Sequence, residues 1–164
     1  MLFRSAQDRT VPFVEAALRK YGIAPACLGI EITESTVMGD PDKAVAALTR
    51  LKDIGVGISL DDFGTGYSSL GYLKRFPIDV LKIDKSFVDD VTTSSSDAAI
   101  ARSVISLAHN LDMRVIAEGV ETRSQVDFLT EHGCDEMQGY YFSRPLPAQA
   151  FTALLREKRM LALA

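Results

Sequence analysis

A strand that ends in two acidic residues and runs into a glycine-rich turn decides the fold. It reads Val56-Gly57-Ile58-Ser59-Leu60-Asp61-Asp62 and continues as Phe63-Gly64-Thr65-Gly66. Successive side chains of a strand alternate between its two faces, so Asp61 shares a face with the small residues Gly57 and Ser59. We therefore expect Asp61 to lie at the end of this strand, on the face with the smallest side chains.

Strands of this kind alternate with amphipathic helices along the chain. The expected strands are Leu28–Thr33, Val56–Asp62, Val80–Asp84, Arg114–Glu118 and Met137–Phe142. The expected helices are Asp42–Lys52, Asp97–Asn110 and Arg123–His132, a shorter one after Ser68, and others near Val11 and after Pro147. This alternation indicates an α/β fold with a parallel sheet.

Local signals support the boundaries of these helices. Asp40 before Pro41 marks a helix start, and Thr122 with Gln125 forms a capping box. Gly55 and Gly133 stand where glycines commonly end helices. The apolar stripe expected for the helix at 97–110 consists of Ile100, Val104, Leu107 and Leu111. The hydroxyl-rich segment at 92–96 is typical of a surface loop, so we expect one domain over residues 1–164.

Each expected strand ends in a polar side chain. These are Glu31, Asp61 with Asp62, Lys82, Glu118 and Gln138, with spacings of 30, 21, 36 and 20 residues. The carboxyl ends of parallel strands open onto one mouth, so these groups should converge. Acidic groups that converge repel one another unless cations are present, and hard oxygen ligands favour Mg²⁺ or Mn²⁺. A metal-dependent barrel, an ion-paired rim without catalysis, and a barrel that stabilises an enolate all stay open.

The composition limits the classes of function. The chain has 18 Lys and Arg residues and 22 Asp and Glu residues, which gives a net charge of -4. This charge argues against a protein that binds nucleic-acid polymers. No apolar run approaches the roughly 20 residues that span a bilayer, so no membrane segment is expected and the chain is predicted to be cytoplasmic. Cys27 and Cys134 are expected to be small buried residues, and His109 and His132 to be helix residues and not metal ligands.

Five motifs, in order, resemble those of the EAL-domain cyclic di-GMP phosphodiesterases. They are Glu31-Ile32-Thr33-Glu34-Ser35, Asp61-Asp62-Phe63-Gly64-Thr65-Gly66-Tyr67-Ser68-Ser69-Leu70, Leu81-Lys82-Ile83-Asp84, Ala117-Glu118-Gly119-Val120-Glu121 and Gln138-Gly139-Tyr140-Tyr141-Phe142-Ser143-Arg144-Pro145. The resemblance covers the chain from about Ser5 to Leu154. It implies an incomplete TIM-type (β/α) barrel with about five parallel strands and flanking helices. It also implies hydrolysis of cyclic di-GMP to linear pGpG with two Mg²⁺ or Mn²⁺ ions.

The resemblance assigns roles to the strand-end residues. It implies that Glu31 and Asp61 are metal ligands, with Asp61 bridging both ions, and that Asp62 binds the second metal. Lys82 resembles the group that orients the nucleophilic water. Glu118 resembles a metal ligand or a base near that water.

Further roles are implied around this centre. Gln138 would hydrogen-bond a metal-bound water, and Glu121 would lie on the substrate side. Glu34 resembles the residue that anchors the loop after Asp62. Gly64, Thr65 and Gly66 belong to that loop, in which the glycines would permit a bend over the metals.

The chain departs from the family pattern near its start. No Glu-Ala-Leu tripeptide occurs, and Met1-Leu2-Phe3-Arg4 stands about where the family has a strand with an Asn ligand. Compared with the roughly 250 residues of a full barrel, about one third is absent, as in a fragment or a natural truncation. We expect impaired activity of the isolated chain and self-association into a homo-oligomer through the open barrel edge. The alternative is a non-catalytic EAL-like module that binds a nucleotide or a protein partner.

Overall fold

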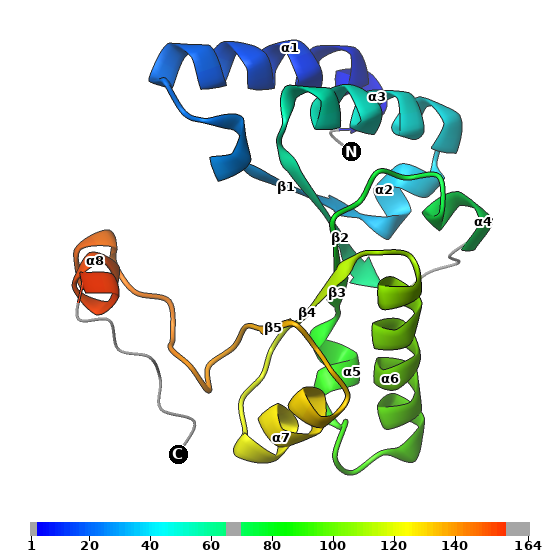
Figure 1. Ribbon diagram of the computed structural model, residues 1–164, viewed down its shortest axis with the longest axis vertical. Helices are drawn as coiled ribbons and strands as arrows, with labels where there is room; N and C mark the ends of the chain where they lie inside the picture. Colours follow the sequence, from blue (N-terminus) through cyan, green and yellow to red (C-terminus); the bar gives the residue numbers. More distant parts are fainter. Residues whose placement is uncertain (1–2, 65–69, 157–164) are drawn as a thin grey trace.

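The computed structural model describes residues 3–64 and 70–156 (Figure 1). Five parallel strands form one sheet in the order β1-β2-β3-β4-β5. Their bounds are β1 Gly29–Thr33, β2 Gly57–Phe63, β3 Val80–Ile83, β4 Arg114–Ala117 and β5 Glu136–Met137. The sheet is an arc whose edges are β1 and β5, so the predicted α/β fold with an incomplete barrel is confirmed.

Helices flank this arc. Their bounds are α1 Phe3–Tyr21, α2 Glu34–Met38, α3 Pro41–Ile54, α4 Leu70–Leu73, α5 Lys85–Asp89, α6 Ser95–Asn110, α7 Arg123–Glu131 and α8 Ala148–Arg156, with a 3₁₀ turn at Pro25–Cys27. Figure 1 shows α1 beside α3 at the β1 end, α6 and α7 at the β4 end, and α8 standing apart from the sheet. None of the helices in the described part of the chain has the length and apolar character needed to span a bilayer.

The predicted helix boundaries are formed by local hydrogen bonds. The Asp40 side chain accepts from the Lys43 N–H at the start of α3. Gly55 ends that helix with φ 98°, a left-handed conformation that glycine adopts at little cost. Thr122 and Gln125 form the predicted capping box at the start of α7. These predictions are confirmed because capping depends only on residues close in sequence.

The buried face of α6 differs from the predicted one. Its buried residues are Ala98, Ala101, Val104, Ile105 and Ala108. Ile100, placed on the apolar stripe by the sequence pattern, is 37% exposed. Three of the buried residues are alanines, and small side chains let a helix approach its neighbours closely. The prediction is wrong for Ile100 but confirmed for Val104, and Leu107 and Leu111 pack partly buried against the core.

Two expected elements have other bounds. Helix α1 begins at Phe3 and not near Val11, so Phe3 and Arg4 are helical and do not form a strand; Met1 and Leu2 lie outside the described residues. The strand expected at 137–142 is only Glu136–Met137. After it the chain turns, because the N–H groups of Phe142 and Ser143 both donate to the Gly139 carbonyl.

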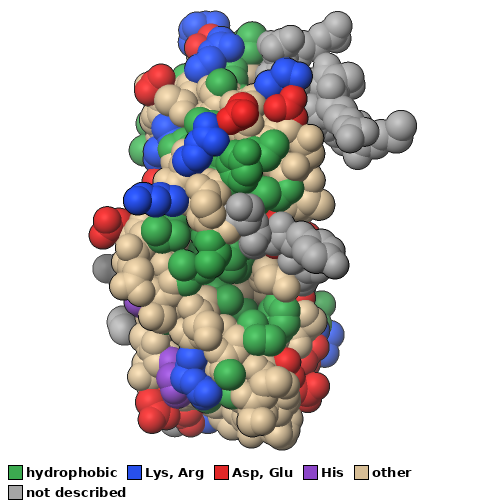
Figure 2. Space-filling model, turned by 90° about the vertical axis from the view of Figure 1, so that its right-hand side faces the viewer, with side chains coloured by type: hydrophobic (Ala, Val, Ile, Leu, Met, Phe, Trp, Pro, Cys, Tyr) green, Lys and Arg blue, Asp and Glu red, His purple; other side chains and the backbone are tan. Residues whose placement is uncertain are grey.

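The side of the molecule that carries α4 and α6 exposes hydrophobic side chains in separate patches. Figure 2 shows these patches set among polar surface and charged side chains. Leu70 of α4 is 58% exposed. Isolated apolar residues of this kind are ordinary on a protein surface and require no partner.

His109 is a helix residue, as predicted, whereas His132 is the C-cap residue that directly follows α7. His109 lies in the last turn of α6, and its Nε2 atom is 3.0 Å from the Oδ2 atom of Asp135. Asp135 also accepts a hydrogen bond of 2.7 Å from the Val115 N–H. Burial opposes ionisation of Asp135, but these two hydrogen bonds outweigh it and lower its pKa. The contacts join the end of α6 to the start of β4.

The two cysteines have different surroundings. Cys27 is exposed at the end of the 3₁₀ turn, so its predicted burial is wrong. Cys134 is partly buried, and its Sγ donates to the Glu136 carbonyl at 3.2 Å. Burial raises the pKa of the Cys134 thiol to about 11.

Iodoacetamide at pH 8 should therefore discriminate between the two thiols. Alkylation needs the thiolate, and a pKa of about 11 in place of 9.0 reduces the thiolate fraction of Cys134 about 100-fold. We expect Cys134 to react about 100-fold more slowly than an ordinary exposed thiol, as measured by peptide mass spectrometry. Cys27→Ser should leave only the slow reaction. Equal labelling rates at both positions would contradict this assignment.

Candidate active site at the carboxyl ends of the strands

Four ionisable side chains from four strands or strand ends converge on one point. Lys82, on the central strand β3, has a side chain that is only 5% exposed. Its Nζ atom lies 2.6 Å from Glu118, 3.1 Å from Glu31 and 3.3 Å from Asp61, measured to one carboxylate oxygen of each. We call Glu31, Asp61, Lys82 and Glu118 the strand-end cluster.

The sheet register explains this convergence. Glu31 and Asp61 lie on adjacent strands, where Glu31 pairs with Ser59 and Thr33 pairs with Asp61. Glu118 directly follows β4, and its N–H continues the ladder by donating to the Ile83 carbonyl. Lys82 lies between them on β3, so its long side chain can reach carboxylates on both sides. The sequence predicted this convergence from the strand ends alone.

A β-bulge in β2 keeps Asp62, like Asp61, away from the core. Leu60 pairs with Leu81 but Phe63 pairs with Ile83, so β2 has one additional residue over this stretch. Asp62 has φ 56°, a positive value that is uncommon for a residue other than glycine. Simple alternation would put Asp62 on the buried face with Ile58 and Leu60. The bulge returns Phe63 to that face instead, where it is 5% exposed.

The charges of the cluster shift the pKa of two groups. Burial acts to lower the pKa of Lys82, but hydrogen bonds to Glu118 and Glu31 outweigh it and raise the pKa, so the ammonium stays charged. The pKa of Asp62 is raised by burial and then by repulsion from Asp61 and Asp84. The Asp62 N–H donates to Asp61 at 3.1 Å. The site is therefore a group of acidic side chains around one buried ammonium, that of Lys82.

The donor atoms suit a hard divalent cation. Glu31, Asp61, Asp62 and Glu118 offer only carboxylate oxygens, which are the ligands that Mg²⁺ and Mn²⁺ prefer. Across residues 3–64 and 70–156, however, no three His, Cys, Asp or Glu side chains are grouped as a metal-ligand set. The three carboxylates of the cluster are grouped around Lys82 Nζ instead.

Glu34 lies behind the loop that follows Asp62. Its side chain is buried, at 3% exposure, and its Oε2 atom accepts a hydrogen bond of 3.3 Å from the Gly64 N–H. Its Oε1 atom has no hydrogen-bond partner among the described residues. Gly64 has φ 96°, and a Cβ atom there would lie 3.1 Å from the Phe87 ring. The predicted loop residues Thr65 and Gly66 lie outside the described residues.

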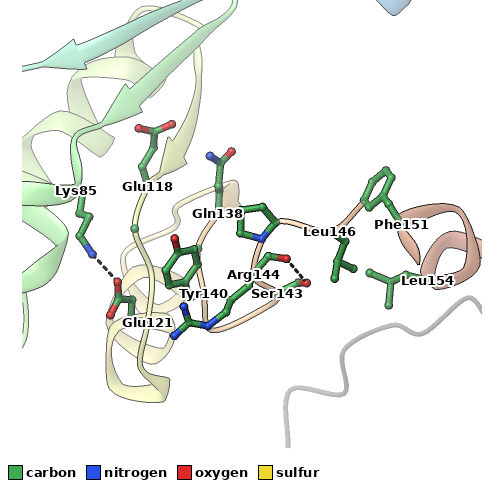
Figure 3. Close-up of a pocket in the computed structure, with 13 residues that line it drawn as sticks. Lys85, Glu118, Glu121, Gln138, Tyr140, Ser143, Arg144, Leu146, Phe151 and Leu154 are labelled. Carbon is green, nitrogen blue, oxygen red and sulfur yellow. Dashed lines mark hydrogen bonds and ion pairs between the residues drawn. The ribbon is translucent and has the colours of Figure 1, made fainter. Parts of the chain in front are cut away.

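A pocket of about 780 Å³ extends from the cluster toward α8. Figure 3 shows Glu118 and Gln138 pointing to the same side at one end, and Leu146, Phe151 and Leu154 at the other. Gln138 follows β5 and is exposed. The pocket therefore joins polar strand ends to an apolar wall.

Between these ends lie charged residues. Glu121 pairs with Lys85 at 2.5 Å, and this contact lowers the pKa of the Glu121 carboxyl, with a smaller effect from Arg144 (Figure 3). The Arg144 guanidinium lies 4.7 Å from the centre of the Tyr140 ring. Lys85 and the residues of α8 were not predicted as site residues. Lys85 follows the Lys82 motif directly, and that adjacency was the available signal.

The comparisons with known proteins agree with this geometry. The model of the EAL domain family matches residues 3–145, so the chain belongs to the EAL domain family. The chain is 48% identical to the cyclic di-GMP phosphodiesterase NbdA of Pseudomonas aeruginosa, over 89% of this chain and 19% of NbdA. It is 47% identical to the bifunctional diguanylate cyclase/cyclic di-GMP phosphodiesterase MucR of the same species, over 87% of this chain and 21% of MucR.

Solved structures of the same family have a similar fold. The PaMucR phosphodiesterase in complex with c-di-GMP superposes with a TM-score of 0.85 at 45% identity, covering 89% of this chain and 60% of that one. The manganese/cy-diGMP complex of Klebsiella pneumoniae BlrP1 gives a TM-score of 0.79 at 34% identity, covering 87% of this chain and 37% of that one. The chain thus spans about one fifth of the length of these two curated relatives and less than two thirds of these two solved chains.

Proposed function

We propose that the strand-end cluster belongs to the catalytic centre of a phosphodiesterase that hydrolyses cyclic di-GMP to linear pGpG. The observation that carries this proposal is the position of three carboxylates within 3.3 Å of Lys82 Nζ at the mouth of the sheet. Relatives of this family that carry the name cyclic di-GMP phosphodiesterase support the choice of substrate. The cytoplasmic location expected from the sequence stays a prediction.

In this proposal Glu31, Asp61, Asp62 and Glu118 hold two divalent cations, Mg²⁺ or Mn²⁺. Such cations polarise a phosphodiester, make a water nucleophilic at neutral pH and stabilise the leaving oxygen. The manganese complex of BlrP1 supports a divalent requirement in the family. Asp61 has the inner position, next to both Lys82 and Asp62, which suits a ligand shared by two ions.

The other residues of the chain position the reactants. Lys82 is charged and donates only, so it can orient an attacking water through the oxygen lone pairs. Glu118 lies 2.6 Å from Lys82 and can accept a proton from a water held there. Gln138 can hydrogen-bond a water at the same mouth. Glu121 lines the adjacent pocket, where it would lie on the substrate side.

Glu34 would hold the loop after Asp62 through its hydrogen bond to Gly64. A buried carboxylate that accepts from a backbone N–H fixes the position of that backbone, and Gly64 is two residues from Asp62. Gly64 has a positive φ, which permits a bend at the start of this loop, and the loop role proposed for Thr65 and Gly66 lies outside the described residues. In this proposal Glu34 and the loop act through Asp62.

The chain by itself should turn over slowly. Two ligands that the family pattern supplies, the Glu of a Glu-Ala-Leu tripeptide and an Asn on the strand before α1, are absent from its 164 residues. The loss of a ligand weakens a hard-cation site. The proposed activity therefore refers to a complete EAL domain, and a non-catalytic binding module is the competing proposal for the isolated chain.

Cation-dependent binding of cyclic di-GMP separates these proposals. We expect the chain to bind cyclic di-GMP in Mn²⁺ but not in EDTA, and Asp61→Asn to weaken that binding about tenfold or more. Asp42→Asn, which changes an exposed carboxylate paired with Arg75, should bind like the wild type. Isothermal titration gives the affinities, and chromatography gives the pGpG formed. Binding that needs neither Mn²⁺ nor Asp61 would instead identify a non-catalytic module.

We also propose that the chain forms a homo-oligomer through the edges of the arc. In the described residues β1 pairs only with β2 and β5 only with β4, so each edge strand has one side without a strand partner. Unpaired edges of this kind are templates for pairing with another chain. We expect sedimentation velocity to show dimers or larger species at micromolar concentrations. A single monomer boundary across that range would contradict this proposal.

A further inference from the structure

We propose that Lys82 is an internal counter-ion that competes with a divalent cation for Glu31, Asp61 and Glu118. This inference rests on the proposed function, because it concerns the same carboxylates. The geometry points to it directly: one ammonium nitrogen lies within 3.3 Å of an oxygen from each of the three carboxylates.

The ammonium lies at the centre of the three carboxylates that a cation would use as ligands. A lysine ammonium has three N–H donors, and three carboxylates surround this one. Mg²⁺ binds its oxygen ligands at about 2.1 Å, so a cation held by the second oxygens of these carboxylates would lie close to Nζ. Two positive charges at that distance repel each other. The ammonium therefore opposes cation binding, and a bound cation favours a shift of Nζ away from some of its partners.

The cluster has a reason to keep such a counter-ion. Three carboxylates around one ammonium leave two negative charges in excess, so without Lys82 the carboxylates would repel one another strongly. Lys82 is 5% exposed by its side chain, whereas Glu31 is 61% exposed, so Glu31 can turn toward solvent more easily than Lys82 can. We expect the exchange to begin at Glu31, while Glu118, at 2.6 Å, is held longest.

The arrangement of the carboxylates supports competition between Lys82 and a divalent cation. Throughout the described ranges, 3–64 and 70–156, no three metal-ligating side chains form a ligand set. The donor chemistry suits Mg²⁺ or Mn²⁺, but the arrangement suits an ammonium. In this view Lys82 keeps the carboxylates together before the cation arrives and sets how tightly it is bound.

The test compares Mn²⁺ binding in three lysine variants. Lys82→Met removes the competitor, so we expect Mn²⁺ affinity to rise about tenfold or more, and the melting temperature without metal to fall. Lys82→Arg keeps the charge and should bind Mn²⁺ nearly as the wild type does. Lys52→Met breaks the ion pair with Asp79, at the opposite end of the strands, and should not change Mn²⁺ affinity. Titration calorimetry and electron paramagnetic resonance of free Mn²⁺ provide the readout.

The outcomes separate this inference from the proposed function. If the wild type binds Mn²⁺ through Asp61 but Lys82→Met binds no more tightly, competition is wrong and the metal site stands. An equal gain in Lys82→Arg would also overturn it, because charge would not be the cause. If neither wild type nor Lys82→Met binds Mn²⁺, both proposals fail. If Lys82→Met unfolds without metal, recovery of its fold in Mn²⁺ supports the inference, and failure to recover overturns it.

Discussion

Gly139→Ala is expected to lower the free energy of unfolding by about 3 kcal/mol, at the upper end of the usual cost of overpacking. A Cβ atom at this position would lie 2.1 Å from the Val120 carbonyl oxygen and 2.3 Å from the Val120 nitrogen. Both neighbours are backbone atoms, and Val120 is fully buried, so neither can move aside at low cost.

The clash would also break two hydrogen bonds that position the site. The Val120 N–H donates to the Gln138 carbonyl, and the Tyr141 N–H donates to the Val120 carbonyl. Their loss would displace Gln138 and the chain after Glu118 together. Gly29→Ala is the matched control, because no atom lies within 4 Å of its Cβ position.

Urea unfolding monitored by circular dichroism measures both variants. We expect Gly29→Ala to unfold within about 0.5 kcal/mol of the wild type, as a substitution without a steric conflict does. If Gly139→Ala unfolded at the same urea concentration as Gly29→Ala, the close approach to Val120 would not be a constraint on this turn.

The strands β1 to β4 could be predicted from the sequence because their signals are local. Alternation of apolar and small residues, with glycines and prolines at the ends, places each within one residue of its expected bounds. The fifth strand fails for a reason that is not local. Gly139 contacts Val120, which lies 19 residues earlier, and no pattern within the segment at 137–142 shows that contact.

The candidate site was predictable in outline but not in detail. The rule that parallel strands end at one mouth places Glu31, Asp61, Lys82 and Glu118 together. The same rule places Asp62 beside Asp61, but the alternation of side chains has no place for the additional residue in β2 and by itself would turn Asp62 into the core. The pocket wall includes residues of α8, which follows the matched family region, and no motif in the sequence marked them as part of a site.

Mn²⁺ is expected to stabilise the wild-type chain and to stabilise Asp61→Asn far less. A ligand that binds only the folded state stabilises it by about 2.7 kcal/mol at a hundredfold excess over its dissociation constant. Asp61 lies between Lys82 and Asp62, so replacing its carboxylate with an amide removes the charge at the centre of the donor set. Most of the gain should therefore be lost.

The same substitution should change the metal-free stability little. Lys82 keeps its contacts with Glu118 and Glu31 in Asp61→Asn, and the cluster has one negative charge fewer. Thermal melting with and without millimolar Mn²⁺ measures both quantities, with Asp42→Asn as a control that should respond to Mn²⁺ as the wild type does. Equal Mn²⁺-induced shifts in wild type and Asp61→Asn would mean that the strand ends do not form a shared cation site, and the proposed roles of Glu31, Asp61 and Glu118 as ligands would fail together.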